Sequence, residues 1–135
     1  MANFSGFGID LPFKAASDMN AYQYCFVKLD TVAGANYVDL ATGASEPVPL
    51  GVLTNDPNVD GAATVRVAGI SKVWVSSSTA VEVGNFLISG SGGQAEVVNS
   101  DASAFSGIAL EDMTAGSGYM PVLLRPYVSI VSGTT

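Results

Sequence analysis

Short apolar runs separated by turn residues dominate the chain from Tyr22 onward. Runs of this kind, rich in Val, Ile, Leu, Tyr and Phe and bounded by Gly, Ser, Asn and Asp, are typical of β-strands. Apolar positions at helical spacing are scarce, and only residues 15–22 and 100–105 could form a helical turn. Strands are therefore predicted over residues 22–29, 37–40, 50–54, 63–67, 72–75, 85–88, 96–98, 107–110 and 119–124. Many short strands at this spacing predict an all-β sandwich or small barrel.

The strand pattern occurs twice along the chain. Residues 51–56 (Gly-Val-Leu-Thr-Asn-Asp) and 65–67 (Val-Arg-Val) match residues 107–112 (Gly-Ile-Ala-Leu-Glu-Asp) and 122–124 (Val-Leu-Leu). Upstream, residues 26–28 match 86–88, and each copy continues through a glycine-containing turn to a strand that carries Val38 or Val97. Two copies are too few to stack as a solenoid. The repeat therefore predicts one compact, pseudo-symmetric β body built from two degenerate copies of a β module.

The first 20 residues differ from the rest of the chain. Apolar residues alternate there with Gly6, Gly8 and Pro12, which oppose helix formation, so an extended N-terminal arm is predicted. Its large apolar side chains need burial on the arm's own domain, on a neighbouring subunit or on a partner. The candidate contact residues in this arm are Phe4, Phe7, Ile9, Leu11 and Phe13. The predicted organisation is an arm over residues 1–20, a single all-β domain over 21–127 and a C-terminal tail over 128–135.

Pro121 lies inside the last predicted strand. Because proline has no N–H to donate to a neighbouring strand, this position predicts an edge strand or a bulge. An exposed sheet edge needs cover, which a second subunit can supply. The proline therefore favours self-association.

Charged residues make up 13% of the chain, against about 25% in a typical soluble domain. A surface this poor in charge suggests that another molecule covers part of it. The net charge of −7, with only five scattered basic residues, argues against binding to nucleic acid or to an anionic membrane. Residues 1–12 lack the features of a secretory signal, and no run of ~20 apolar residues is present to span a bilayer. Synthesis in a reducing cytoplasm is therefore expected.

The chain offers little catalytic chemistry. It has no His to serve as a base, and its single Cys25 lies in an apolar strand pattern, so neither a catalytic triad nor a disulfide is expected. Residues 56–61 match the first half of an EF-hand calcium loop, but Val67 stands where the bidentate acid is required, and a polar turn is the preferred interpretation. Neighbours on a strand point to opposite faces, so Glu111 and Asp112 are not expected to act as an acid–base pair. No enzyme activity, cofactor or metal site is predicted.

Trp74 alternates with Val73 and Val75 on a predicted strand. A Trp in this pattern is more often a core or interface anchor than a platform for a sugar ring, so Trp74 joins the candidate contact residues. The alternative is a binding module displayed on a surface, such as a carbohydrate-binding or adhesion domain. Its platforms would be Trp74 and Tyr37.

Several of these motifs together resemble the head decoration, or capsid cement, proteins of tailed bacteriophages. The resemblance lies in residues 49–57 (Pro-Leu-Gly-Val-Leu-Thr-Asn-Asp-Pro) and 63–73 (Ala-Thr-Val-Arg-Val-Ala-Gly-Ile-Ser-Lys-Val). It continues in residues 83–87 (Val-Gly-Asn-Phe-Leu), 107–111 and 122–124. In total it covers residues 22–125.

The resemblance implies an all-β accessory protein on the outside of an icosahedral head, which binds the major capsid protein and clamps neighbouring subunits after the shell expands. Many proteins of this family are trimers, and others are dimers or monomers. A homo-oligomer is therefore expected, with a trimer favoured over a dimer. The implied location is the capsid exterior of the virion, after synthesis in the host bacterium. Several symmetric copies that each bury apolar surface would give strong binding from weak contacts.

Overall fold

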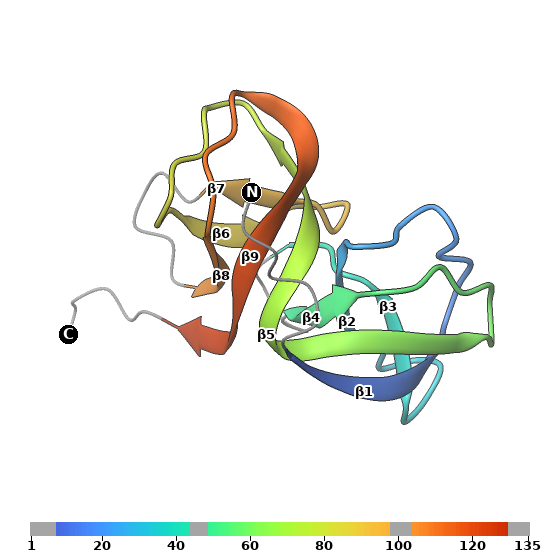
Figure 1. Cartoon of the computed structure of the whole chain (residues 1–135). Coiled ribbons are helices and arrows are strands. Elements are labelled where there is room, and N and C mark those ends of the chain that lie inside the picture. The colour runs from blue at the N-terminus through green and yellow to red at the C-terminus, as the bar shows by residue number, and fades with distance from the viewer. Residues whose placement is uncertain (1–7, 44–48, 98–103, 130–135) are drawn as a thin grey trace.

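The computed structural model describes residues 8–43, 49–97 and 104–129, which form one sheet of nine strands (Figure 1). The predicted all-β class is confirmed, and no helix occurs in these ranges. Within them, accordingly, no helix is long and apolar enough to cross a membrane. The strands are β1 (Gly8–Ala15), β2 (Phe26–Leu29), β3 (Tyr37–Leu40), β4 (Pro49–Leu53), β5 (Ala62–Ser77), β6 (Phe86–Ser89), β7 (Ala95–Val97), β8 (Ala104–Ala109) and β9 (Gly116–Ser129).

The sheet closes on itself twice, because β5 is long enough to belong to two rings of strands. The first ring runs β1-β3-β2-β4-β5 and closes where β1 pairs with the first half of β5. The second ring runs β5-β7-β6-β8-β9 and closes where β9 pairs with the second half of β5. We call them the N-terminal ring and the C-terminal ring. They lie side by side in Figure 1, on the right and the left, and β5 passes from one to the other.

The residue register confirms the repeat seen in the sequence. Residues that pair across strands in one ring are matched by the repeat to residues that pair across strands in the other ring. The pairs are Phe26–Val52 and Val52–Arg66 in the N-terminal ring, and Phe86–Ile108 and Ile108–Leu123 in the C-terminal ring. The two copies are thus equivalent strand for strand, with β2, β3 and β4 matching β6, β7 and β8.

The strands that carry Val38 and Val97, β3 and β7, are equivalent, although the two valines do not occupy matching positions. Val38 pairs with Leu29 in the first copy, and Ala95 pairs with Ser89 in the second, so Val38 corresponds to Ala95 and not to Val97. The connection from β2 to β3 covers residues 30–36, whereas that from β6 to β7 covers only 90–94. The equivalent strands therefore begin at different distances from the repeated Phe.

The strands predicted over residues 63–67 and 72–75 form one continuous strand, β5. Gly69 lies between them with φ of 97°, a left-handed conformation that glycine adopts at little cost, so the strand turns from one ring to the other without ending. The N-terminal segment is extended, as predicted, and its described part is docked: β1 runs antiparallel to β5, from Gly8 opposite Gly69 to Lys14 opposite Ala62. The place of β1 in the N-terminal ring is that of the second half of β5 in the C-terminal ring.

Pro121 does not lie on an edge strand, because β9 pairs with β5 on one side and with β8 on the other. The Pro121 carbonyl accepts a hydrogen bond from the N–H of Leu110, the residue directly after β8. A residue's N–H and C=O lie on the same side of a strand, so the N–H that proline lacks would face Leu110. That position is beyond the last β8 pair, Ala109–Val122, and the proline therefore ends the β8–β9 ladder without interrupting it.

Each ring encloses its own core, and the two cores match. The N-terminal core consists of Ala15, Met19, Val27, Val38, Leu53, Ala63 and Val65. At matching positions the C-terminal core contains Val75, Val81, Leu87, Ala95, Ala109, Met120 and Val122. Phe26 and Val52 break the symmetry, because they belong to the N-terminal ring but pack into the C-terminal core. The first half of β2 and residues 51–53 of β4 are therefore buried on both faces, which joins the two rings into one packed body.

Candidate binding surfaces

The predicted contact residues on β1 form a partly exposed apolar stripe. Ile9 is 60% exposed and Leu11 is 40% exposed, whereas Phe13 packs against the N-terminal core. We call Ile9 and Leu11 the β1 stripe. Phe4 and Phe7 lie outside the described residues.

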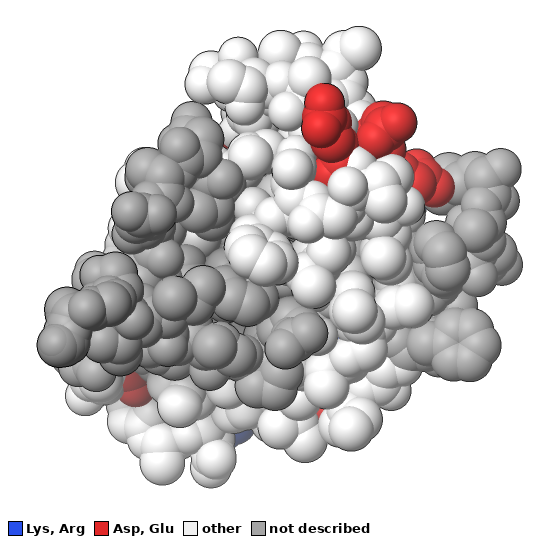
Figure 2. Space-filling view, turned by 90° about the vertical axis from the view of Figure 1, so that its left-hand side faces the viewer, with Lys and Arg blue, Asp and Glu red and all other residues white. Residues whose placement is uncertain are grey.

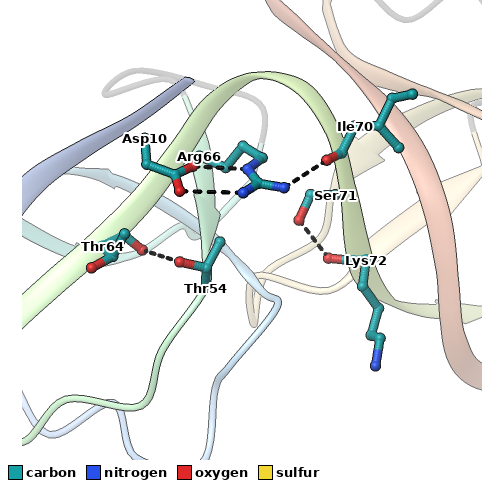
Figure 3. Close-up of polar contacts among 7 residues, drawn as sticks. All are labelled: Asp10, Thr54, Thr64, Arg66, Ile70, Ser71 and Lys72. Atoms are coloured by element: carbon teal, nitrogen blue, oxygen red, sulfur yellow. Dashed lines mark hydrogen bonds and ion pairs between the residues drawn. The ribbon is translucent and has the colours of Figure 1, made fainter. Parts of the chain in front are cut away.

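Arg66 fastens β1 to the junction of the two rings (Figure 3). Its guanidinium donates to the Asp10 carboxylate from Nε at 2.8 Å and from Nη2 at 3.2 Å. Its Nη1 donates to the Ile70 carbonyl at 2.9 Å, just past the bend of β5. The hydrogen bonds to Arg66 lower the pKa of Asp10 below its ordinary value, and those to Asp10 raise the pKa of Arg66. The pair holds β1 where β5 leaves the N-terminal ring.

A row of apolar residues crosses the outer face of the C-terminal ring. Its members come from four neighbouring strands, and each lies opposite the next; they are Phe86, Ile108, Leu123 and Ile70. Phe86 is 44% exposed, and the other three are half-buried. We call these four residues the apolar row. In sequence, Phe86 and Ile108 alternate with the core residues Leu87 and Ala109, which places the row on the opposite face of the sheet.

The matching row of the N-terminal ring is not an exposed apolar surface. It consists of Phe26, Val52, Arg66 and Asp10. Phe26 and Val52 are buried against the C-terminal core, and Arg66 and Asp10 form the ion pair. Figure 2 shows the molecule from the side of the C-terminal ring: the described atoms there are almost all uncharged, and acidic side chains gather at one edge.

Trp74 lies far along the chain from its main aromatic neighbours. It is on β5, opposite Tyr119 of β9, and their ring centroids are 4.9 Å apart at an interplanar angle of 60°. The Tyr119 ring also meets the Tyr24 ring edge-on, at 5.7 Å and 81°. The Lys72 ammonium lies 5.1 Å from the Tyr24 ring centroid and 5.6 Å from that of Tyr119. Tyr24, Trp74 and Tyr119 form what we call the aromatic cluster.

The aromatic pair proposed from the sequence is not brought together. Tyr37 lies on β3 in the N-terminal ring, where its hydroxyl donates to Asp60 at 3.0 Å. Trp74 lies on the half of β5 that belongs to the C-terminal ring. Sequence reasoning found Trp74 but missed Tyr24 and Tyr119, because their proximity depends on the pairing of β5 with β9 and on the packing of one ring against the other.

A pocket of about 350 Å³ opens beside Trp74. Three aromatic and three polar side chains dominate its lining, and the remaining described contributors are small or buried. They are Tyr22, Trp74, Tyr119, Gln23, Ser76 and Gln94, with Ala21, Cys25 and Gly92. None of these side chains is an Asp, Glu, Lys or Arg. Burial raises the pKa of the Cys25 thiol to about 11, so at neutral pH it is protonated and is not a nucleophile.

Tyr24 adopts a left-handed backbone conformation, and the residue at the matching position of the other copy is a glycine. Its φ is 71°, and Gly84, at the matching position two residues before the repeated Phe, has φ of 90°. A bulky residue in this region stores of order 1–3 kcal/mol of strain and is held there by its surroundings. The Tyr24 carbonyl accepts a hydrogen bond from the backbone N–H of Trp74 at 2.8 Å, and the backbone N–H of Tyr24 donates to the Leu53 carbonyl at 2.6 Å. A tyrosine where the other copy has glycine was the sequence signal for this site.

The polar string over residues 56–61 forms the turn that joins β4 to β5. Asp60 has φ of 62°, and its carboxylate accepts the Tyr37 hydroxyl. The Asp112 carboxylate accepts the N–H of Val83 at 2.9 Å, which ties down a loop. Among the described residues, no three of His, Cys, Asp and Glu are grouped so as to hold a metal ion.

Comparison with known proteins relates this fold to a phage head component. No family model and no curated protein matches the chain. Its structure is similar to the crystal structure of the head fiber gp8.5 N base in bacteriophage phi29, with a TM-score of 0.62 and 18% sequence identity. The alignment covers 93% of this chain and 98% of that one. The fold is shared. The resemblance to phage head proteins drawn from the sequence motifs is thereby confirmed at the level of fold.

Proposed function

We propose that this chain is a structural protein of a bacteriophage virion, which binds the outer surface of the head and stabilises the expanded shell by bridging major capsid protein subunits. The observation that carries the proposal is the fold, shared over nearly its whole length with the base of a phage head fiber. The proposed location is the capsid exterior, after synthesis in the cytoplasm of the host. The proposed role is not enzymatic.

Two surfaces of the molecule support a docking role. In the N-terminal ring, Phe26 and Val52 pack against the C-terminal ring. The apolar row occupies the matching positions of the C-terminal ring. The same module face thus offers an apolar surface on the C-terminal ring for a further protein. The β1 stripe adds a second apolar surface on the N-terminal ring. Two contact surfaces on one body suit a protein that bridges subunits.

A homo-oligomer, with a trimer favoured over a dimer, is part of the proposal. Local symmetry axes of an icosahedral shell present several copies of each contact, and a symmetric oligomer can engage them at once. Oligomerisation would also cover part of a surface that is unusually poor in charge. Trp74 and Phe13, predicted as contacts, are largely engaged within the chain, and the proposed contacts are therefore centred on Ile9, Leu11 and the apolar row.

Cosedimentation with purified heads tests the proposal. The protein at saturating concentration is mixed with undecorated expanded heads of its phage and, separately, with unexpanded precursor shells. Binding to expanded heads at a fixed copy number, together with a higher temperature of head disruption, is the expected result. Absence of binding to either shell contradicts the proposal.

Point variants locate the contact. Phe86→Ser introduces a polar group at the most exposed member of the apolar row. Leu11→Ser introduces a polar group in the β1 stripe. Val32→Ser is the matched control, because Val32 is a highly exposed apolar residue in the loop between β2 and β3, outside both surfaces. Substitution is preferable to deletion of the arm, since deletion would remove β1 and open the N-terminal ring. Head binding equal to that of Val32→Ser in both test variants would rule out these two surfaces.

A further inference from the structure

We propose that the pocket beside Trp74 is a binding site for an uncharged saccharide, an activity separate from attachment to the head. A pyranose ring has an apolar C–H face and a rim of hydroxyl groups. Such a ligand needs flat apolar side chains on one side and neutral hydrogen-bonding groups around them. The pocket provides both within about 350 Å³, a volume that suits one or two sugar rings.

The aromatic side of the pocket is exposed where a ligand would meet it. Tyr119 is 55% exposed although it lies in the aromatic cluster with Trp74 and Tyr24. Tyr22, also partly exposed, lines the pocket with Trp74 and Tyr119. Aromatic rings that stay at the surface offer a large apolar area to a ligand at low entropic cost, because the surrounding contacts already hold them.

The polar side of the pocket consists of neutral groups whose orientation is set. The Gln94 carbonyl oxygen accepts the Gly92 N–H at 2.9 Å, and its amide donates to Glu96 at 2.9 Å. The Gln23 amide donates to the Thr54 carbonyl at 2.9 Å. A side-chain amide has two donor hydrogens and two acceptor lone pairs, so both glutamines keep capacity for ligand hydroxyls. With no ionised side chain among the described lining residues, the site favours an uncharged ligand.

The strained backbone of Tyr24 supports a binding role. The matching residue of the other copy is glycine, which adopts this conformation without the penalty. Tyr24, in the turn before β2, places an aromatic side chain against Tyr119 and a carbonyl against the backbone N–H of Trp74. Strain of this kind is typically retained where it positions groups that bind a ligand.

The single tryptophan of the chain makes the test direct. The full chain is titrated with three neutral probes, cellotriose, N-acetylchitotriose and galactobiose, up to about 10 mM, while tryptophan emission is recorded. At least one probe is expected to give a saturable change in emission, which can arise only from the surroundings of Trp74. Backbone amide shifts measured by NMR on the same samples should change at residues 22–25, 92–94 and 119. No saturable change with any of the three probes overturns the proposal.

Variants separate a built site from non-specific stacking. Tyr119→Ala is expected to weaken binding at least about tenfold, which corresponds to 1.4 kcal/mol, and Gln94→Ala, which leaves the aromatic cluster in place, should weaken it by a similar factor. Tyr37→Ala, in the other ring, is the matched control and should bind normally. Binding retained by both test variants overturns the proposal. If tryptophan emission changes with protein concentration and saccharide binding is lost at high protein concentration, a second copy of the chain covers the pocket. That result would also overturn the proposal.

Discussion

Phe26 and Phe86 occupy the same position in two copies of one module, and yet one is 1% exposed and the other 44%. Both begin the second strand of their ring, and both lie opposite the same position of the next strand. Phe26 is buried because the C-terminal ring packs against it. Duplication therefore reproduced the strands and cores of the module, while the environment of its outer face came to depend on what lies next to each copy.

The rest of that face diverged in the same sense. In the N-terminal ring the row continues into Arg66 and Asp10, whose ion pair fastens β1 at the junction. In the C-terminal ring the matching residues are Leu123 and Ile70, which extend an apolar surface. The first copy uses this face to complete the chain's own structure. The second copy presents it to another molecule in the proposed function.

The largest expected difference between the copies is at this pair of phenylalanines. Phe26→Ala should lower the free energy of unfolding by about 3–5 kcal/mol, because it leaves a cavity between the rings. Phe86→Ala should lower it by less, about 1–2 kcal/mol, because Phe86 is 44% exposed and therefore buries less apolar surface than Phe26. Urea denaturation of both variants checks the comparison. Equal losses would show that Phe26 does not join the two cores.

The glycines that begin the repeated motif should differ next. A Cβ at Gly51 would meet the Arg66 carbonyl oxygen, which belongs to a paired strand and cannot move aside. At Gly107 the first contact would be a methyl group of the buried Val122, and the nearest backbone atom, the Leu123 carbonyl oxygen, would lie at 3.1 Å, farther away than the Arg66 oxygen is at Gly51. Gly51→Ala is expected to destabilise the protein by about 2–3 kcal/mol and Gly107→Ala by about 1–2 kcal/mol. Thermal denaturation of the two variants would contradict the account if Gly107→Ala were the less stable.

The left-handed positions give a smaller, more specific contrast. Gly84→Ala adds no contact, since no heavy atom lies within 4 Å of the new Cβ, and the expected loss of about 1–2 kcal/mol is conformational. Tyr24→Gly relieves similar strain but loses the ring contacts with Tyr119, so its net change in stability should stay within about 1 kcal/mol. Calorimetry on both variants measures the contrast. A large loss in Tyr24→Gly would mean that its ring is mainly a structural anchor.

The smallest effect concerns the ion pair of the N-terminal ring and its dependence on pH. The folded-state pKa of Asp10 is lowered by Arg66, so the stabilisation is fully present above the unfolded pKa of about 3.9 and is lost as the pH falls through the folded-state value. Because Asp10 is partly exposed, the contribution should be about 0.5 kcal/mol. Asp10→Asn should lower stability by that amount at pH 7 and by little near pH 2.

The control for the ion pair is Asp56→Asn, which removes a carboxylate from an exposed turn. Its urea midpoints at the two pH values should follow those of the unchanged chain. A loss of stability in Asp10→Asn that is equally large at pH 2 would assign the effect to packing of β1 and not to charge. Raising the ionic strength should also reduce the difference at pH 7.

Much of the fold could be predicted from local patterns. Apolar runs and turn residues located most strands, because strand formation and turn geometry depend on nearby residues. The motif beginning at Gly51 and Gly107 revealed the duplication, and with it the equivalence of strands that the register confirms. The continuity of β5 was missed, because a glycine at positive φ inside a strand has the same local sequence signal as a turn between two strands.

The candidate sites were predicted only in part. Trp74, Ile9 and Leu11 stand out as large apolar residues in polar or mixed surroundings, and all three lie on candidate surfaces or at their rim. The partners that make each surface, such as Tyr119 for Trp74 and Leu123 for Ile108, come from strands distant in sequence. Cross-strand register assigns them, and register is set by the packing of a whole ring.

The amino-acid sequence by itself determined the all-β class, the two copies of the module and the scarcity of catalytic groups, since these follow from composition and short-range periodicity. Only the tertiary structure decided which copies of equivalent residues are buried. Phe26 and Phe86 occupy equivalent positions of the module. The difference between them arises because the outer face of one module packs inside the body, while that of the other lies at its surface.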